Sequence, residues 1–95
     1  MAGFRPDIPP SVAEIIRHLS PELKRSVKHA IRAISADPHC GDPLQRELAD
    51  YWKYRVRRFR IVYSIDRAGR VIRIVAVGPR RTIYEEVAEQ LRRKN

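Results

Sequence analysis

The stretch from Trp52 to Tyr84 constrains the fold of this chain most strongly, because its side chains alternate with the period of a β-strand. Successive residues of a strand point to opposite faces of a sheet. The first segment puts apolar or aromatic residues on one face and cations on the other: Trp52, Tyr54 and Val56 against Lys53, Arg55 and Arg57. A similar alternation follows from Phe59 to Ile65, and then a β-branched run from Val71 to Val77. These segments predict a sheet with an apolar inner face and a cationic outer face.

Helical patterns flank this sheet on both sides. Apolar residues at helical spacing predict a short helix before residue 20 and a longer one that Ser20 caps and Pro21 begins. The short connection predicts that these two helices form an antiparallel hairpin. After the sheet, a third apolar stripe from Ile83 to Leu91 predicts a C-terminal helix. The first ten residues contain three prolines, so we expect extended coil with at most a short edge strand around Gly3–Arg5.

The order of these elements predicts an α+β fold in a single domain that spans residues 1–95. We expect an N-terminal α-helical hairpin packed on a curved antiparallel β-sheet of three to four strands, followed by the short C-terminal helix. Asp66–Gly69 is predicted to connect the second and third strands, and Gly78-Pro79 to end the third strand. Asp42 is assigned to a turn, and Leu44 and Leu48 are expected to pack beneath the sheet or to form one helical turn.

The charge of the chain restricts its partners. Lys and Arg total 20 against 11 Asp and Glu, which gives a formal net charge of +9 and a pI near 10.6. A small domain this basic favours a polyanionic partner, with nucleic acid first. A solvated basic surface and an acidic protein partner are the alternatives that charge alone leaves open.

Several classes of site are excluded by what the sequence lacks. Cys40 is the only cysteine, so the chain can build neither an internal disulfide nor a thiolate metal site. The three histidines lack a carboxylate cluster at ligand spacing, and no P-loop or zinc-protease motif is present, so we expect no metal and no cofactor. No signal-peptide core is visible, and no segment approaches the ~20 apolar residues of a membrane span. We therefore expect a cytoplasmic protein without a membrane partner.

The cations of the outer sheet face are the strongest candidate for a site. Lys53, Arg55 and Arg60 come from adjacent strands, Arg80 follows the last strand, and Tyr84 lies one helical turn further on. Guanidinium groups bind the oxygens of a phosphodiester bidentately and stay charged. RNA carries its own nucleophile, the 2′-hydroxyl, so its cleavage needs in-line positioning, a proton acceptor and stabilised negative charge, but no metal. A basic docking face without catalysis is an equally good interpretation of the same residues.

Two runs, LADYWKYRVRRFRIVYSI and VIRIVAVGPRRTIYEE, resemble the RelE/ParE toxin superfamily, the toxin halves of bacterial type II toxin–antitoxin operons. The resemblance rests on Trp52–Val56, on Phe59–Tyr63, and on Gly78–Arg81 followed by Tyr84, in this order and at this spacing. It extends from about Ser11 to Tyr84 and is closer to the RelE-like mRNA interferase branch. It implies a microbial RNase-like fold and a metal-independent endoribonuclease that cleaves mRNA in the ribosomal A site.

The resemblance also implies a role for each residue of the cationic site. Lys53 stands at a position proposed as the general base, and Arg55 at a second basic position of the strand. Arg60 corresponds to the arginine that stabilises the phosphate, Arg80 to an acid or electrostatic stabiliser, and Tyr84 to the tyrosine that orients the substrate. Four neighbouring cations are expected to bind flanking RNA: Arg57, Arg58, Arg73 and Arg81. The implied partners are a cognate antitoxin, mRNA and the ribosome, with operator DNA reached only through the antitoxin complex.

Three departures from the family pattern keep other interpretations open. The usual N-terminal strand is hard to find in residues 1–10, and Arg58 replaces a residue that is often small or acidic. Pro79 follows the glycine where many relatives carry His or Lys, which leaves Arg80 or Tyr84 as the proton donor. The alternatives to a nuclease are a ParE-like inhibitor of DNA gyrase and a non-catalytic RNA-binding or interaction module. Gyrase-inhibiting relatives usually lack the full catalytic set.

Overall fold

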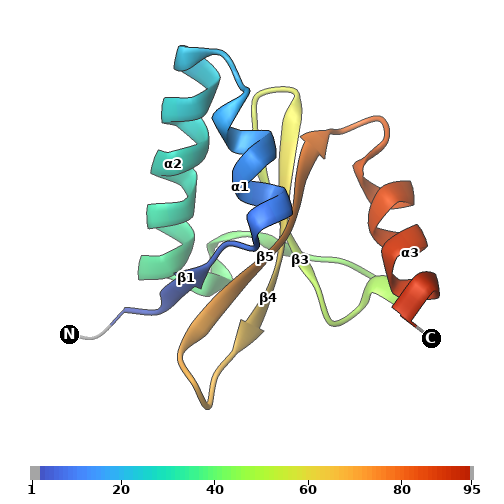
Figure 1. Ribbon diagram of the computed structural model, residues 1–95. Coiled ribbons are helices and arrows are strands. Elements are labelled where there is room, and N and C mark those ends of the chain that lie inside the picture. Colours follow the sequence, from blue (N-terminus) through green and yellow to red (C-terminus); the bar gives the residue numbers. More distant parts are fainter. Residues whose placement is uncertain (1–2, 95) are drawn as a thin grey trace.

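The computed structural model describes residues 3–94 (Figure 1). The strands are β1 Arg5–Asp7, β2 Asp42–Pro43, β3 Trp52–Val56, β4 Phe59–Asp66 and β5 Val71–Pro79. The α-helices are α1 Pro10–Arg17, α2 Pro21–Ala36 and α3 Ile83–Lys94, and two short 3-10 helices, η1 and η2, cover Pro38–Cys40 and Arg46–Leu48. No helix within residues 3–94 is long and apolar enough to cross a membrane.

The strands form one sheet in the order β1-β5-β4-β3-β2. Neighbouring strands are antiparallel except β1 and β5, which run parallel with Arg5 opposite Val71. The α+β class is confirmed, but the sheet is mixed and has five strands rather than three or four. The two edge strands, β1 and β2, have three and two residues and are too short for a visible alternation. Strand β1 lies at Arg5–Asp7 rather than Gly3–Arg5, and its Pro6 is tolerated because β1 is an edge strand.

The helices α1 and α2 form the predicted antiparallel hairpin on one face of the sheet (Figure 1). Ser20 caps α2 by accepting a hydrogen bond from the Leu23 N–H at 3.3 Å, and Pro21 occupies the first turn. The apolar stripes of both helices pack against the inward side chains of the three longer strands. The main core cluster contains Val12, Ile16, Val27, Ile31, Ile34, Val56, Ile61, Tyr63, Ile72 and Ile74. The predicted inner face is therefore confirmed.

The opposite face of the sheet carries a second, smaller core beneath α3 (Figure 1). Its buried members are Leu48, Val62, Ile83 and Val87. The predicted cluster of cations occupies only part of this face, because α3 packs on the apolar residues of the rest. A register shift between β4 and β5 enlarges this apolar area. It leaves Val75 without a partner in β4, so that both Val75 and Ala76 pack against the core beneath α3. The cations are confined to the part of this face that α3 leaves uncovered.

The two ends of β5 differ in how well the sequence predicted them. At its start, Asp66–Gly69 makes the expected connection, and an Asp66 carboxylate oxygen accepts a hydrogen bond from the Gly69 N–H at 3.0 Å. At its end, Gly78 and Pro79 do not break the strand but pair with Arg60 and Phe59 of β4. Pro79 fits because it is the last residue of the strand. Gly78 lets α3 approach closely, since a Cβ atom there would lie 2.9 Å from Cδ1 of Ile83.

Candidate functional site

A hollow of about 330 Å³ opens beside α3 on the less covered face of the sheet. The residues that line it are Asp42, Lys53, Arg55, Arg60, Arg80 and Tyr84. They come from β2, β3, β4, the turn after β5 and the first turn of α3. All five residues predicted to be catalytic therefore converge on one site, which we name the cation pocket.

The strand register explains why these side chains meet. Arg55 of β3 lies directly opposite Arg60 of β4, and Lys53 shares the face of Arg55 because it precedes it by two residues. On its other side Arg60 faces Gly78 of β5, which has no side chain to fill the hollow. Like charges directly opposite each other destabilise an antiparallel pair. The placement of Arg55 opposite Arg60 is therefore unfavourable by itself, which is typical of a site that receives an anion.

Arg60 is the charged residue that the sheet buries most deeply, with 8% of its surface exposed. Its Nη1 donates hydrogen bonds to the carbonyl oxygens of Phe59 at 2.9 Å and Arg57 at 3.1 Å. A guanidinium has five N–H donors and stays protonated in proteins. The two carbonyls therefore fix the side chain without neutralising it, and the remaining donors are left for a ligand.

The other cations approach the pocket from its rim. Nζ of Lys53 lies 5.8 Å from the centre of the half-buried Tyr84 ring, within the range of a cation–π contact. Arg80 is exposed, and its main-chain N–H donates a hydrogen bond to the carbonyl of Arg58 at 2.8 Å. Tyr84 is thus neither sealed in the interior nor turned away, and it forms one wall of the pocket.

Within residues 3–94, no carboxylate forms an ion pair with the four cations of the pocket. The ion pairs of this part of the chain involve other side chains, none of them Lys53, Arg55, Arg60 or Arg80. Unneutralised cations that line a concave site focus a positive potential there. Charge-assisted hydrogen bonds from guanidinium groups are well suited to the oxygens of a phosphate. The pocket is therefore built to hold a phosphate or a similar anion.

Asp42 belongs to the pocket although the sequence assigned it to a turn. The two-residue strand β2 pairs Asp42 with Lys53, and this pairing places Asp42 at the pocket wall. A strand of two residues has no periodicity, so nothing in the sequence distinguishes Asp42 from an ordinary turn aspartate.

A buried tyrosine anchors the segment that leads to Asp42. The Tyr63 hydroxyl donates a hydrogen bond to the carbonyl of Pro38 in η1 at 2.7 Å, and Tyr63 has no exposed surface. Burial raises the pKa of Tyr63 far above its ordinary value, and the nearby thiol of Cys40 and carboxylate of Asp37 act in the same direction. The phenol therefore stays a neutral donor and holds η1 against the sheet.

The four cations predicted to bind flanking RNA lie outside the pocket. Arg57 is not on the outer face with Lys53 and Arg55, because it lies in the β3–β4 turn with φ at 56° and pairs with Glu22 of α2 at 3.5 Å. Arg73 is held by Asp66 at 3.3 Å and Asp7 at 3.9 Å. Arg58 and Arg81 are exposed in the turns before β4 and before α3.

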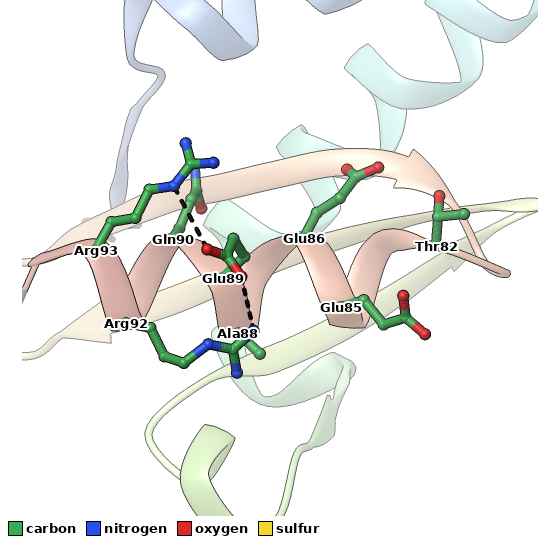
Figure 2. A pocket seen from close by; sticks show the side chains of 8 residues that line it. All are labelled: Thr82, Glu85, Glu86, Ala88, Glu89, Gln90, Arg92 and Arg93. Carbon is green, nitrogen blue, oxygen red and sulfur yellow. Dashed lines mark hydrogen bonds and ion pairs between the residues drawn. The ribbon is translucent and has the colours of Figure 1, made fainter.

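A wider hollow of about 700 Å³ on the outer face of α3 is not an equivalent site (Figure 2). Its two arginines already bind the same carboxylate, with Arg92 at 2.8 Å and Arg93 at 3.5 Å from Glu89. Glu85 and Glu86 also line it, so negative charge is at least as abundant there as positive charge. This hollow lacks the excess of cations that distinguishes the cation pocket.

Comparison with known proteins agrees with this architecture. The family model described as the ParE toxin of the type II toxin–antitoxin system parDE matches residues 11–84. A chain of the RelBE2 toxin–antitoxin complex from Mycobacterium tuberculosis is 27% identical, with a TM-score of 0.73 over 84% of this chain and 94% of that one. A free mutant of E. coli toxin RelE is 22% identical, with a TM-score of 0.72 over 94% and 93%.

The Agrobacterium tumefaciens YoeB/ParE toxin is 18% identical, with a TM-score of 0.70 over 80% of this chain and 98% of that one. At this identity the likeness shows the fold alone, and no curated protein sequence matches the chain. The family model, however, covers most of the chain and includes β3, β4, β5 and the start of α3. With the RelE-like fold, this match establishes that the chain belongs to the ParE toxin family of type II toxin–antitoxin systems, within the RelE/ParE superfamily.

Proposed function

We propose that this toxin is a metal-independent endoribonuclease that cleaves mRNA on the ribosome. The observation that carries the proposal is the cation pocket, in which one tyrosine and four cations without a carboxylate partner among the described residues line the same hollow. The family resemblance implies that gyrase-inhibiting relatives usually lack this full set of residues, so Arg60, Arg80 and Tyr84 together favour the nuclease. Four cations also disfavour the binding of a divalent metal, so the charge on phosphorus would be stabilised by the side chains themselves.

The proposed reaction is a transfer of the phosphodiester within the RNA. The 2′-oxygen attacks phosphorus, the bond from phosphorus to the 5′-oxygen breaks, and a 2′,3′-cyclic phosphate and a 5′-hydroxyl result. Arg60 and Arg55 would bind the non-bridging oxygens, where negative charge grows in the transition state. Arg80 would stabilise the leaving 5′-oxygen, and Tyr84 would orient the nucleotide and donate the proton that this oxygen takes up.

Two groups of the pocket are candidates for the acceptor of the 2′-hydroxyl proton. Lys53 is the one that the family resemblance implies, but in its ammonium form it has donors only. Asp42 pairs with Lys53 in the strand register and brings carboxylate oxygens to the same wall. Asp42→Asn and Lys53→Met separate the two, because loss of the true base lowers cleavage on the order of 100-fold or more.

We further propose that a cognate antitoxin neutralises the toxin. The solved structures that resemble this chain include the RelBE2 toxin–antitoxin complex and an archaeal RelE–RelB complex from Pyrococcus horikoshii. A net charge of +9 favours an acidic segment in the partner. Binding of such a segment over the cation pocket would exclude mRNA from it.

Expression of the wild-type toxin and of its pocket variants in bacterial cells tests the proposal. We expect the wild type to arrest growth and to leave cleaved ribosome-bound mRNA with 2′,3′-cyclic phosphate ends. Arg80→Ala and Arg60→Ala should each reduce cleavage on the order of 100-fold, because each removes a donor to the transition state. Primer extension on mRNA and the growth rate are the two measurements.

The control is Arg92→Ala, which removes an equal charge from the outer face of α3, where Arg92 is paired with Glu89. Its cleavage and toxicity should match the wild type. Broken DNA linked to gyrase, with intact mRNA, would replace the nuclease with a gyrase inhibitor. RNA binding without toxicity or cleavage would leave a non-catalytic RNA-binding module.

A further inference from the structure

A second basic groove lies on the other face of β3, between that strand and α2. Its volume is about 390 Å³, and the residues that line it are Arg25, Ser26, His29, Ala30, Tyr54, Arg55, Val56 and Arg57. Arg25 and His29 are exposed on neighbouring turns of α2, and Tyr54 is half-buried at the edge of the main core. We name this groove the α2 groove.

Arg55 connects the α2 groove with the cation pocket, because it lines both. The edge of β3 between them is open in the part of the chain that the structure describes. Strand β2 pairs with β3 only at Trp52 and Lys53, so no strand covers the margin from Tyr54 to Val56. An extended polymer can therefore pass from one site around this edge into the other while it stays in contact with Arg55.

The lining of the α2 groove suits single-stranded nucleic acid. Sites of this kind combine cations that follow the phosphates with aromatic rings on which bases stack, and stacking tolerates any base. Arg25, Arg57 and Arg55 supply the cations, and Tyr54 supplies the ring. Among the described residues, the carboxylate that forms an ion pair with one of these groups is Glu22, whose pair with Arg57 is 3.5 Å long and mostly exposed. Exposed pairs contribute little, so a phosphate can displace Glu22.

We infer that the α2 groove binds the nucleotides that flank the scissile phosphodiester of a single-stranded RNA, with Arg55 as the bridge between the two sites. The inference rests on the proposed nuclease function and adds a second subsite to it. It also assigns roles to Arg25, His29 and Tyr54, none of which lines the cation pocket. A longer RNA reaches both sites, whereas a dinucleotide reaches only one.

Binding of uncleavable RNA tests this inference independently of catalysis. The probes are a fluorescent 2′-O-methyl hexanucleotide and the matching dinucleotide, measured by anisotropy over a range of salt concentrations. We expect Arg25→Ala/His29→Ala to weaken hexanucleotide binding about tenfold and to lower its salt slope by about 0.7 for each phosphate that the variant no longer neutralises. Dinucleotide binding should not change.

The control is Lys28→Ala/Arg32→Ala, which removes two charges from the same helix outside the groove, one more than the groove variant loses with His29 counted as neutral. It should leave the slope of hexanucleotide binding unchanged. A second pair of variants tests stacking: Tyr54→Phe should bind like the wild type, whereas Tyr54→Leu, which keeps an apolar side chain at the core, should lose about tenfold in affinity. Wild-type binding by Tyr54→Phe excludes a role of the hydroxyl, and an unchanged unfolding midpoint of Tyr54→Leu shows that its loss of affinity is a loss of stacking rather than of packing.

The outcomes distinguish this inference from the proposed function. If the wild type and the Arg25→Ala/His29→Ala variant bound the hexanucleotide equally well, the subsite would be overturned. The proposed function would still hold if Arg80→Ala reduced cleavage. Equal losses in the groove and control variants would also overturn it, as a general effect of charge. If the groove variants lost affinity for polyglutamate but not for RNA, the groove would be a protein-binding surface instead. A wild type that bound neither RNA would overturn the inference, whereas the proposed function stands or falls separately with the cleavage of ribosome-bound mRNA.

Discussion

A single buried hydroxyl, that of Tyr63, connects the centre of the sheet to the segment that carries Asp42. It is fully buried and donates a hydrogen bond to the carbonyl of Pro38, which holds η1 against the sheet together with the edge-on contact of His39 with Trp52. Gly41, next to Asp42, packs so closely against Lys53 and Tyr63 that a Cβ atom there would collide with both. The position of the pocket carboxylate thus depends on side chains that never touch a substrate.

We predict that Tyr63→Phe lowers the free energy of unfolding by about 1 kcal/mol because it removes one hydrogen bond. The loss is larger if the Pro38 carbonyl finds no other hydrogen-bond donor. The phenyl ring keeps the packing of the main core, so only the hydrogen bond is removed. Urea denaturation followed by circular dichroism measures the change. Tyr51→Phe is the control, since Tyr51 forms no side-chain hydrogen bond within the described residues. A neutral effect of Tyr63→Phe would show that η1 is held by other contacts.

Single residues were predictable where one strand alternates without interruption. The period of two places Lys53 with Arg55 and, across the hairpin, with Arg60, so three members of the pocket follow from the sequence. The same reasoning failed for Arg57, because a two-residue turn with positive φ takes it out of the alternation. Asp42 was missed since its strand pairing is a tertiary contact without a local pattern.

Among the elements, the β4–β5 hairpin carries a carboxyl group with a shifted pKa, that of Asp66 at the end of β4. The Gly69 N–H hydrogen bond, together with Arg73, holds the pKa of Asp66 below its usual value. A carboxyl group whose pKa is depressed in the folded state stabilises that state above its unfolded pKa of roughly 3.9. The contribution is lost as the pH falls through the folded pKa.

We therefore predict that Asp66→Asn makes the unfolding free energy less dependent on pH below about 4, while it destabilises the hairpin at neutral pH. Urea denaturation of the wild type and of Asp66→Asn at several acidic pH values measures how steeply the unfolding free energy of each protein changes with pH. Asp50→Asn serves as the control, because Asp50 is exposed and forms no ion pair within the described residues. Identical acid slopes for the wild type and Asp66→Asn would contradict the prediction.

The elements that the sequence predicted are those long enough to show a period. The helices α1, α2 and α3 and the strands β3, β4 and β5 each bury an apolar stripe, and the position of each followed from that stripe. Strands β1 and β2 are specified by pairing with β5 and β3 instead. The second core beneath α3 was missed for a related reason. Val62 is an isolated apolar residue in the sequence pattern, and only the tertiary structure brings Ile83 and Val87 against it.

For the molecule as a whole, the excess of positive charge works against compactness. The ion pairs of the described residues lie at the surface and contribute little each, whereas the net charge of +9 acts on the folded state throughout. We predict that the free energy of unfolding rises as NaCl is increased from about 0.05 to 0.5 M, because shorter screening lengths weaken the repulsion. Thermal denaturation in NaCl measures this, and a fall in stability would mean that the attractive pairs dominate.

The β3–β4 turn has a consequence beyond its own two residues. The carbonyl of Arg57 accepts a hydrogen bond from the Arg60 guanidinium, and the carbonyl of Arg58 accepts one from the main-chain N–H of Arg80. Two arginines from separate parts of the chain are therefore held by one short piece of backbone. We predict that lengthening that turn by one residue would shift both arginines at once and abolish the proposed cleavage, although every side chain of the cation pocket would still be present.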